Sequence, residues 1–176
     1  MRKSISQFLL ALAVFLFTLH GGTLALAADF NEAADLQIGP FVPGGSYSEE
    51  TTEGYLSLRE GNSLSPAANG LPARNDIRFK FGVVSVNDGK FLAFATSKKS
   101  EMLQTPRHIG VGNTKDEVLA AYGEPDQLNE KFIRGLGWLP VYTYGQNTKE
   151  AGLEFYVFKL SNKVVQIRFY SQGLQL

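Results

Sequence analysis

The sequence predicts an α+β fold in which antiparallel β-hairpins pack against one short helix. Two segments, Ile77–Phe81 and Leu153–Phe158, have the composition of half-buried or buried strands. Turn signals follow, at Asn87–Gly89 for the first and Ser161–Lys163 for the second, so each region is expected to fold as a hairpin. Between the hairpins, residues 105–125 carry both the start and the stop signals of a helix.

The predicted helix covers residues 114–122. Thr114 can cap its first turn, and Glu117 can reach back to complete a capping box, while Asp116 and Glu117 suit the positive end of the helix dipole. Gly123 can end the helix and Pro125 prevents it from resuming. The apolar residues expected on one face, packed against the sheet, are Val118, Leu119 and Tyr122.

Outside these hairpins and this helix, the sequence signals for secondary structure are weaker. The cluster Tyr55–Leu58 predicts one short strand, and residues 77–86 predict a single strand with a bulge at Gly82, which pairs with a returning strand at 91–96. Residues 62–75 predict an exposed loop, either a functional segment or an inert insertion. After the helix, residues 127–137 predict a further loop.

The two hairpins have similar sequences. Residues 90–94 align with residues 163–167 at a spacing of 73, each beginning with a lysine and two apolar residues. An internal repeat explains this, with half-repeats at 28–100 and 101–176 of a single domain. Shared turn chemistry is the alternative. No twin of the 114–122 helix is readable in the first half, so we expect that helix to be lost or remodelled there.

The amino terminus predicts export. Arg2 and Lys3 precede an apolar run, Phe8–Leu19, and a small-residue cleavage signal at Ala25–Ala27. The run is shorter than the roughly 20 residues that a transmembrane helix needs. We therefore expect residues 1–27 to be a signal peptide, with the mature chain periplasmic or extracellular and not inserted in the membrane.

Composition excludes several classes of partner and site. There is no cysteine, which excludes disulfides and a lipidated cysteine anchor. The chain has 17 basic and 17 acidic residues, and loss of Arg2 and Lys3 leaves 15 against 17. A net charge near −2 argues against a nucleic-acid partner.

No set of catalytic, cofactor-binding or metal-binding residues is apparent, and we expect no enzyme activity. His108 is the single histidine outside the expected signal peptide, which is too few for a zinc site, and no nucleophile motif accompanies it. Gly110-Val-Gly112 lacks the rest of a dinucleotide fingerprint. The adjacent carboxylates Asp116 and Glu117 are explained by helix capping rather than by glycoside hydrolysis.

One aromatic cluster is a candidate surface for binding a partner. Its members are Phe132, Arg134, Trp138, Tyr142 and Tyr144. Exposed aromatic rings beside an arginine are common anchors of protein interfaces. The alternative is that these rings fill the core, with Trp138 the exception because it lies between Gly137 and Pro140.

Residues 77–170 resemble a group of small extracytoplasmic bacterial modules with the β-lactamase-inhibitor-protein-like (BLIP-like) fold. The resemblance rests on three stretches: residues 105–125, the Tyr-x-Tyr-Gly at 142–145, and the hairpin at 153–167. The helix motif is also similar to that of the BamE/SmpA outer-membrane assembly lipoproteins, although this chain lacks their lipidated cysteine. The resemblance implies tandem units of a sheet with a helical piece and non-enzymatic relatives that bind proteins. The expected function is therefore a binding module for a protein or cell-envelope component, or alternatively an inhibitor of an extracellular hydrolase.

Overall fold

The protein is described by a computed structural model at residues 29–145 and 151–171. The segment expected to be a signal peptide, residues 1–27, lies outside the described residues. Within the described ranges, no helix is both long enough and apolar enough to span a bilayer.

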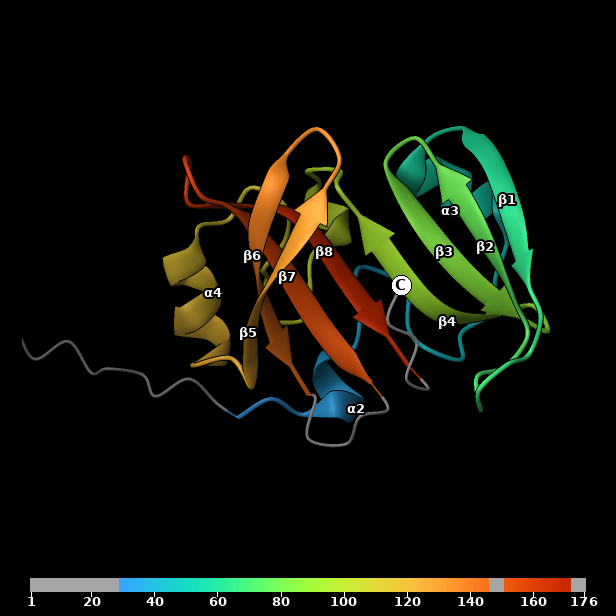
Figure 1. Ribbon diagram of the computed structural model, residues 1–176, viewed down its shortest axis with the longest axis horizontal. Helices are drawn as coiled ribbons and strands as arrows, with labels where there is room; N and C mark the ends of the chain where they lie inside the picture. Colours follow the sequence, from blue (N-terminus) through green and yellow to red (C-terminus); the bar gives the residue numbers. More distant parts are fainter. Residues whose placement is uncertain (1–28, 146–150, 172–176) are drawn as a thin grey trace, which may run out of the picture.

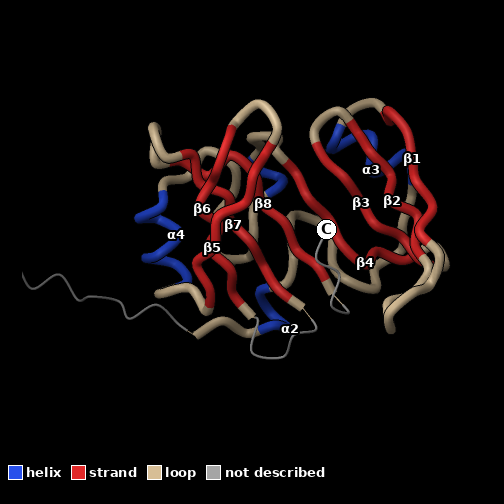
Figure 2. The backbone as a smooth tube through the Cα atoms, in the orientation of Figure 1, coloured by secondary structure: helices blue, strands red, loops and turns tan. Residues whose placement is uncertain are grey.

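Eight strands form one antiparallel sheet in the order β1-β2-β3-β4-β8-β7-β6-β5 (Figures 1 and 2). Two meanders of four consecutive strands thus meet at the centre, where β4 pairs with β8, and the expectation of antiparallel hairpins is confirmed. The strands are β1 (Arg59–Ser65), β2 (Arg74–Phe79), β3 (Gly82–Asn87), β4 (Lys90–Thr96), β5 (Gln127–Ile133), β6 (Gly137–Tyr144), β7 (Gly152–Phe158) and β8 (Lys163–Tyr170).

Short helices lie around this sheet. They are α2 (Glu32–Asp35), α3 (Glu49–Leu56), α4 (Lys115–Tyr122) and a 3₁₀ turn at Glu101–Leu103. In Figure 1, α4 lies beside the β5–β8 half, and α3 lies behind the β1–β4 half. The helix expected at 114–122 is present with its complete capping box: the Thr114 hydroxyl accepts from the Glu117 amide at 3.2 Å, and Glu117 accepts from the Thr114 amide at 2.6 Å.

Two local expectations are wrong and a third holds only in part. The cluster Tyr55–Leu58, expected as a strand, is mostly the end of α3, because Ser48 caps a helix that begins at Glu49. The loop expected at 127–137 largely forms β5, and the loop expected at 62–75 is a loop at residues 66–73, while its ends belong to β1 and to the start of β2. These are the two edge strands of the sheet and the start of a neighbouring one, so their sequences lack the apolar alternation of central strands.

The bulge expected at Gly82 is instead a tight turn that separates β2 from β3. Phe79 pairs with Gly82 across this turn. A Cβ atom at Gly82 would lie 2.1 Å from the carbonyl oxygen of Ala95, so only glycine permits the close pairing of β3 with β4 here. At the next turn, Asp88 and Gly89 both have positive φ, as the Asn-Asp-Gly signal predicts.

One face of the sheet forms the main core with the helices. Leu56 of α3 and both Val118 and Tyr122 of α4 are buried in this apolar cluster. The Tyr122 ring lies 5.3 Å from that of Phe155 in β7. The hydroxyl of Tyr144 donates to the carbonyl of Gly123 at 2.9 Å, which joins β6 to the end of α4.

The two halves correspond in detail. Each meander follows an eight-residue helix that is capped by a hydroxyl, Ser48 or Thr114. Each helix ends at a residue of positive φ, with Ser57 at φ 67°, ψ −168° and Gly123 at φ 76°, ψ −159°. The β3–β4 and β7–β8 hairpins also share a register shift at the same place. A capped eight-residue helix, α3, thus precedes the first meander, where the sequence showed no readable counterpart of the 114–122 helix.

Candidate binding site

The second face of the sheet is the open one. In the described residues, every helical apolar residue in a buried cluster belongs to the main core on the opposite face. The open face carries a hollow of about 520 Å³, which we call the central hollow. Strand residues alone line it: Ser63, Arg74, Asp76, Arg78, Val83, Ala95, Lys131, Phe132, Ile133, Tyr156, Gln166 and Arg168.

A buried carboxylate organises one side of the central hollow. Glu154 is 1% exposed, and its carboxylate receives Lys131 Nζ at 3.0 Å and the Tyr156 hydroxyl at 2.7 Å. Arg168, which is 3% exposed, places Nε 3.3 Å from the same carboxylate and its guanidinium over the ring of Tyr170. Two cations and a hydroxyl group thus converge on Glu154, which offsets the cost of burying its charge.

A second polar group lies on the other side of the hollow. Asp76 of β2 accepts from the Ser85 hydroxyl at 2.5 Å and from Arg74 Nε at 3.2 Å. Arg78, two residues along the same strand, is exposed, and its side chain has no hydrogen bond or ion pair with another described residue. The cations of the hollow are therefore of two kinds, those held by carboxylates and the free guanidinium of Arg78.

The structure divides the aromatic cluster that the sequence singled out. Tyr144 is 1% exposed and belongs to the main core, as the core alternative predicts. Tyr142 is partly buried and packs against the same core. Phe132 and Trp138 are 61% and 60% exposed and face each other across β5 and β6, with ring centroids 5.8 Å apart. Arg134 is exposed in the turn between these two strands.

Exposed apolar side chains concentrate on this β5–β6 hairpin. Of the eight large apolar residues that are exposed in the described part of the chain, the hairpin contributes four: Leu128, Phe132, Leu136 and Trp138. Because β5 is also an edge strand, its backbone is open on one side. Phe132 is among the residues that border the central hollow, but its ring and that of Trp138 lie on the other face of the sheet. The two residues pair with each other, and Trp138 precedes Leu139, which packs with Tyr156 on the open face. The exposed hairpin and the hollow are therefore two separate candidate surfaces.

Comparison with known proteins gives only distant structural similarity. No protein-family model and no curated protein sequence matches the chain. A cysteine-rich secretory protein from Staphylococcus aureus subsp. aureus Mu50 is similar over 73% of this chain and 44% of its own, at 12% identity and a TM-score of 0.44. An extracellular protein containing an SCP domain from Bacillus anthracis str. Ames is similar over 74% and 44%, at 12% identity and a TM-score of 0.43. The chain spans less than half the length of either protein.

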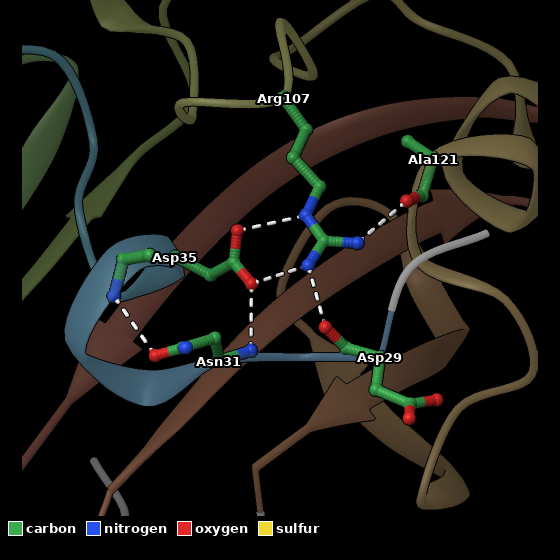
Figure 3. A network of polar contacts seen from close by, with 6 residues as sticks. Asp29, Asn31, Asp35, Arg107 and Ala121 are labelled. Atoms are coloured by element: carbon green, nitrogen blue, oxygen red, sulfur yellow. Dashed lines mark hydrogen bonds and ion pairs between the residues drawn. The ribbon is translucent and has the colours of Figure 1, made fainter.

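A different polar cluster joins distant segments of the chain (Figure 3). Arg107 donates from Nε to one oxygen of Asp35 at 2.8 Å and from NH2 to the other at 2.6 Å. It also donates to the backbone carbonyls of Asp29 and Ala121, both at 2.8 Å, and lies over the ring of Tyr122. Its contacts therefore tie the amino-terminal segment to α4. The neighbouring His108 is exposed, with φ of 62°.

The sequence analysis missed Glu154 and Arg168. Their signal was present: each is a charged residue inside an apolar strand, between Leu153 and Phe155 in one case and between Ile167 and Phe169 in the other. A charge at such a position must have partners when it is buried. Its partners, however, are on other strands, and the sequence does not show which residues the register brings beside it.

Burial raises the pKa values of three tyrosines, which therefore ionise at a higher pH than exposed tyrosines do. It raises the pKa of Tyr122 to about 12, and it also raises the pKa values of Tyr144 and Tyr156. The folded protein then keeps these protons at a pH where the unfolded chain, with tyrosine pKa values near 10, has lost them. We expect this contribution to stability to be complete below about pH 10 and to disappear as the pH rises through about 12.

Tyrosinate absorbance measured during an alkaline titration tests this expectation. In denaturant, all seven tyrosines should ionise together near the ordinary value. In the folded protein, part of the signal should appear only when the circular dichroism of the fold is lost. Complete ionisation near pH 10 with the fold intact would contradict the burial argument.

Proposed function

We propose that this protein is an exported, non-catalytic binding module that holds a protein of the cell envelope through its β5–β6 hairpin. The observation that carries the proposal is the concentration of exposed apolar side chains on this hairpin, at one edge of the sheet. Exposed aromatic rings gathered in one patch are typical of protein interfaces.

Duplication of a four-stranded unit would explain the breadth of the sheet in such a module. The matching helices, caps and register shifts described above support descent of the two meanders from one duplicated unit of the BLIP-like type. Duplication joins two small sheets into one wide sheet, since β4 of one half pairs with β8 of the other. The joined sheet offers a broad open face, whereas each four-stranded unit alone would offer half of it.

The proposal includes export of the protein and the absence of catalysis. The amino-terminal pattern of charge, apolar run and small residues supports export. On the open face, the carboxylates are explained by pairing: Glu154 meets two cations and a hydroxyl group, and Asp76 meets one cation and a hydroxyl group. This arrangement suits recognition rather than acid–base chemistry, which needs a carboxyl group free to exchange its proton with a substrate.

Capture from an envelope extract tests the proposal. The mature protein is immobilised beside a double variant, Phe132→Ala with Trp138→Ala. Because both rings are more than half exposed, we expect the double variant to keep the melting temperature of the wild type and to lose the captured partner. The matched control is Leu58→Ala with Leu160→Ala, which removes two exposed apolar side chains away from the hollow, at 74% and 89% exposure.

The outcomes separate the alternatives. Loss of the same captured protein from the double variant, with retention by the control, supports binding through the hairpin. Equal capture by all three proteins would overturn the proposed surface. If the captured protein is a hydrolase whose rate falls on binding, the module acts as its inhibitor; chemical conversion of the captured molecule would show an enzyme instead.

A further inference from the structure

The two outer strands of the sheet differ in how readily a further strand can pair with them. The outer strand β1 has a register shift between Arg59 and Gly61, and a bulge of this kind obstructs the pairing of an edge with another chain. The outer strand β5 pairs with β6 over seven consecutive residues without a shift, and it contains neither glycine nor proline. Five of its residues are exposed. β5 is therefore the edge that can accept a strand.

The backbone of Glu130 faces the open side of β5. Glu130 pairs with Pro140, which has no amide proton, so the pair is of the antiparallel type in which the two residues exchange no hydrogen bonds. The amide and carbonyl of Glu130 therefore point away from β6, and by alternation those of Leu128 and Phe132 do so as well. Apart from its ladder with β6 and the turn that follows, β5 forms no backbone hydrogen bond with another described residue.

The sequence of β5 is self-complementary about Glu130. When two copies of β5 are placed antiparallel with a twofold axis at Glu130, Leu128 of one copy lies opposite Phe132 of the other, and all seven residues have a partner. Leu128 and Phe132 are 60% and 61% exposed, so each supplies the apolar neighbour that the other lacks. The pairs at Leu128, Glu130 and Phe132 can form about six backbone hydrogen bonds, since each such pair exchanges both.

The charges near this axis balance. The two Glu130 carboxylates would meet there, and like charges on facing residues are unfavourable. Each carboxylate, however, forms an ion pair with Lys159 of its own copy, so every anion at the axis has a cation beside it. On the opposite face, Asn129 lies across from Lys131, whose ammonium group is held by Glu154. The described charges near the axis therefore do not oppose the pairing.

We propose that two copies of this chain pair antiparallel through β5, with a twofold axis at Glu130, so that one continuous sheet runs across both. On the face that carries the helices, Trp138 and Phe132 of one copy then lie in line with Leu128 and Tyr142 of the other. The two hairpin patches become one apolar stripe. Its outer surface stays open to a further protein, because strand pairing covers the edge of the sheet and not its face.

The size of the contact predicts a weak dimer. Protein interfaces contain about one hydrogen bond per 100–200 Å², so about six hydrogen bonds correspond to roughly 600–1,200 Å² of buried surface. This area lies at the lower end for specific interfaces and favours a dissociation constant on the order of 10 µM. Sedimentation velocity of the mature protein from about 1 µM to about 1 mM should therefore show a shift from monomer to dimer.

Charge reversal at the axis tests the pairing. Glu130→Lys replaces the two anions at the axis by cations, beside the two Lys159 side chains, and should weaken self-association at least about tenfold. A mixture of this variant with the wild type should restore dimers, because glutamate then faces lysine. The matched control is Glu60→Lys, the same charge change at an exposed position of β1, which should leave self-association unchanged. Both side chains are exposed, so both variants should keep the circular dichroism of the wild type.

A single cysteine tests the register. The chain has no cysteine, and facing residues of a hydrogen-bonded antiparallel pair have Cα atoms about 5.5 Å apart, within reach of a disulfide. Glu130→Cys should therefore form a disulfide-linked dimer when oxidised glutathione is added. Leu128→Cys alone should not, since its copy across the axis is about 14 Å away. A mixture of Leu128→Cys with Phe132→Cys should link the two variants.

The contrary results are distinct from those for the proposed function. The pairing is overturned by monomers at every concentration, by equal effects of Glu130→Lys and Glu60→Lys, or by equal linking of Glu130→Cys and Leu128→Cys. A chain that stays monomeric but captures its envelope protein would refute the pairing and leave the proposed function. Dimers that capture no envelope protein would refute the proposed function and leave the pairing.

Discussion

Replacing Glu154 by alanine is expected to lower the free energy of unfolding by about 3–5 kcal/mol, because it removes a carboxylate that forms an ion pair with a buried guanidinium. Arg168 is 3% exposed and would keep its charge in the sheet without that partner. Lys131 and the Tyr156 hydroxyl would lose their acceptor as well. Denaturant unfolding of the wild type and the variant measures the difference.

Two further variants test whether the loss of stability comes from the buried charge. Glu154→Gln keeps the size and a hydrogen-bond acceptor but removes the charge, so its loss should be smaller than that of Glu154→Ala. Glu130→Ala breaks an ion pair with Lys159 in which both side chains are about half exposed, and its effect should be much smaller again. Equal losses for Glu130→Ala and Glu154→Ala would show that burial does not govern these pairs.

Arg107→Ala is expected to lower the free energy of unfolding by about 3 kcal/mol. The substitution removes both hydrogen bonds that Arg107 donates to Asp35, which is 3% exposed, and leaves that carboxylate buried with a hydrogen bond from the Asn31 amide. It also removes the donors to the backbone of Asp29 and Ala121 (Figure 3). Hydrogen exchange should therefore rise in the segment 29–35 as well as at the end of α4.

An arginine in an exposed pair provides the matched control. Arg59 contacts Glu49 at 2.8 Å, with both side chains substantially exposed, and Arg59→Ala should leave stability nearly unchanged. Asp35→Asn should also be costly, because it leaves Arg107 without its anionic partner. If Arg107→Ala unfolds at the same denaturant concentration as Arg59→Ala, the contacts of Arg107 do not stabilise the fold more than an exposed ion pair does.

Local signals predicted the elements whose geometry is decided within a few residues. The 114–122 helix depends on a cap at Thr114 and a stop at Gly123, all within about ten residues of chain. The turn at Asp88 and Gly89 depends on residues that tolerate positive φ. Such elements can be predicted because their hydrogen bonds close inside the segment that encodes them.

The missed elements depend on contacts from outside their own segments. In α3, Ser57 ends the helix at a positive φ without a glycine, so the usual stop signal is absent. β5 has a mostly exposed, polar sequence and is held by its pairing with β6. Its strand character therefore comes from the partner strand rather than from its own apolar pattern.

The candidate site, too, was predicted only where local sequence was sufficient. Sequence reasoning selected Phe132 and Trp138 together with Tyr142 and Tyr144, because all four are aromatic and close along the chain. Only the fold separates the first pair, which is exposed, from the second, which packs on the core. The central hollow was not predictable, since its lining comes from β1, β2, β3, β4, β5, β7 and β8.

By itself, the sequence determined the capped helix, the central hairpins, the absence of cysteine chemistry and an amino terminus with the pattern of an export signal. The tertiary structure alone decided that residues 49–56 form the helix α3, that β4 joins β8, and that Val83 and Ala95 lie between Arg78 and Arg168. The physical reason is the distance along the chain between the residues that interact. Caps and turns are stabilised by neighbours in the chain, whereas strand order, burial and the sum of charges in a hollow depend on residues that only folding brings together.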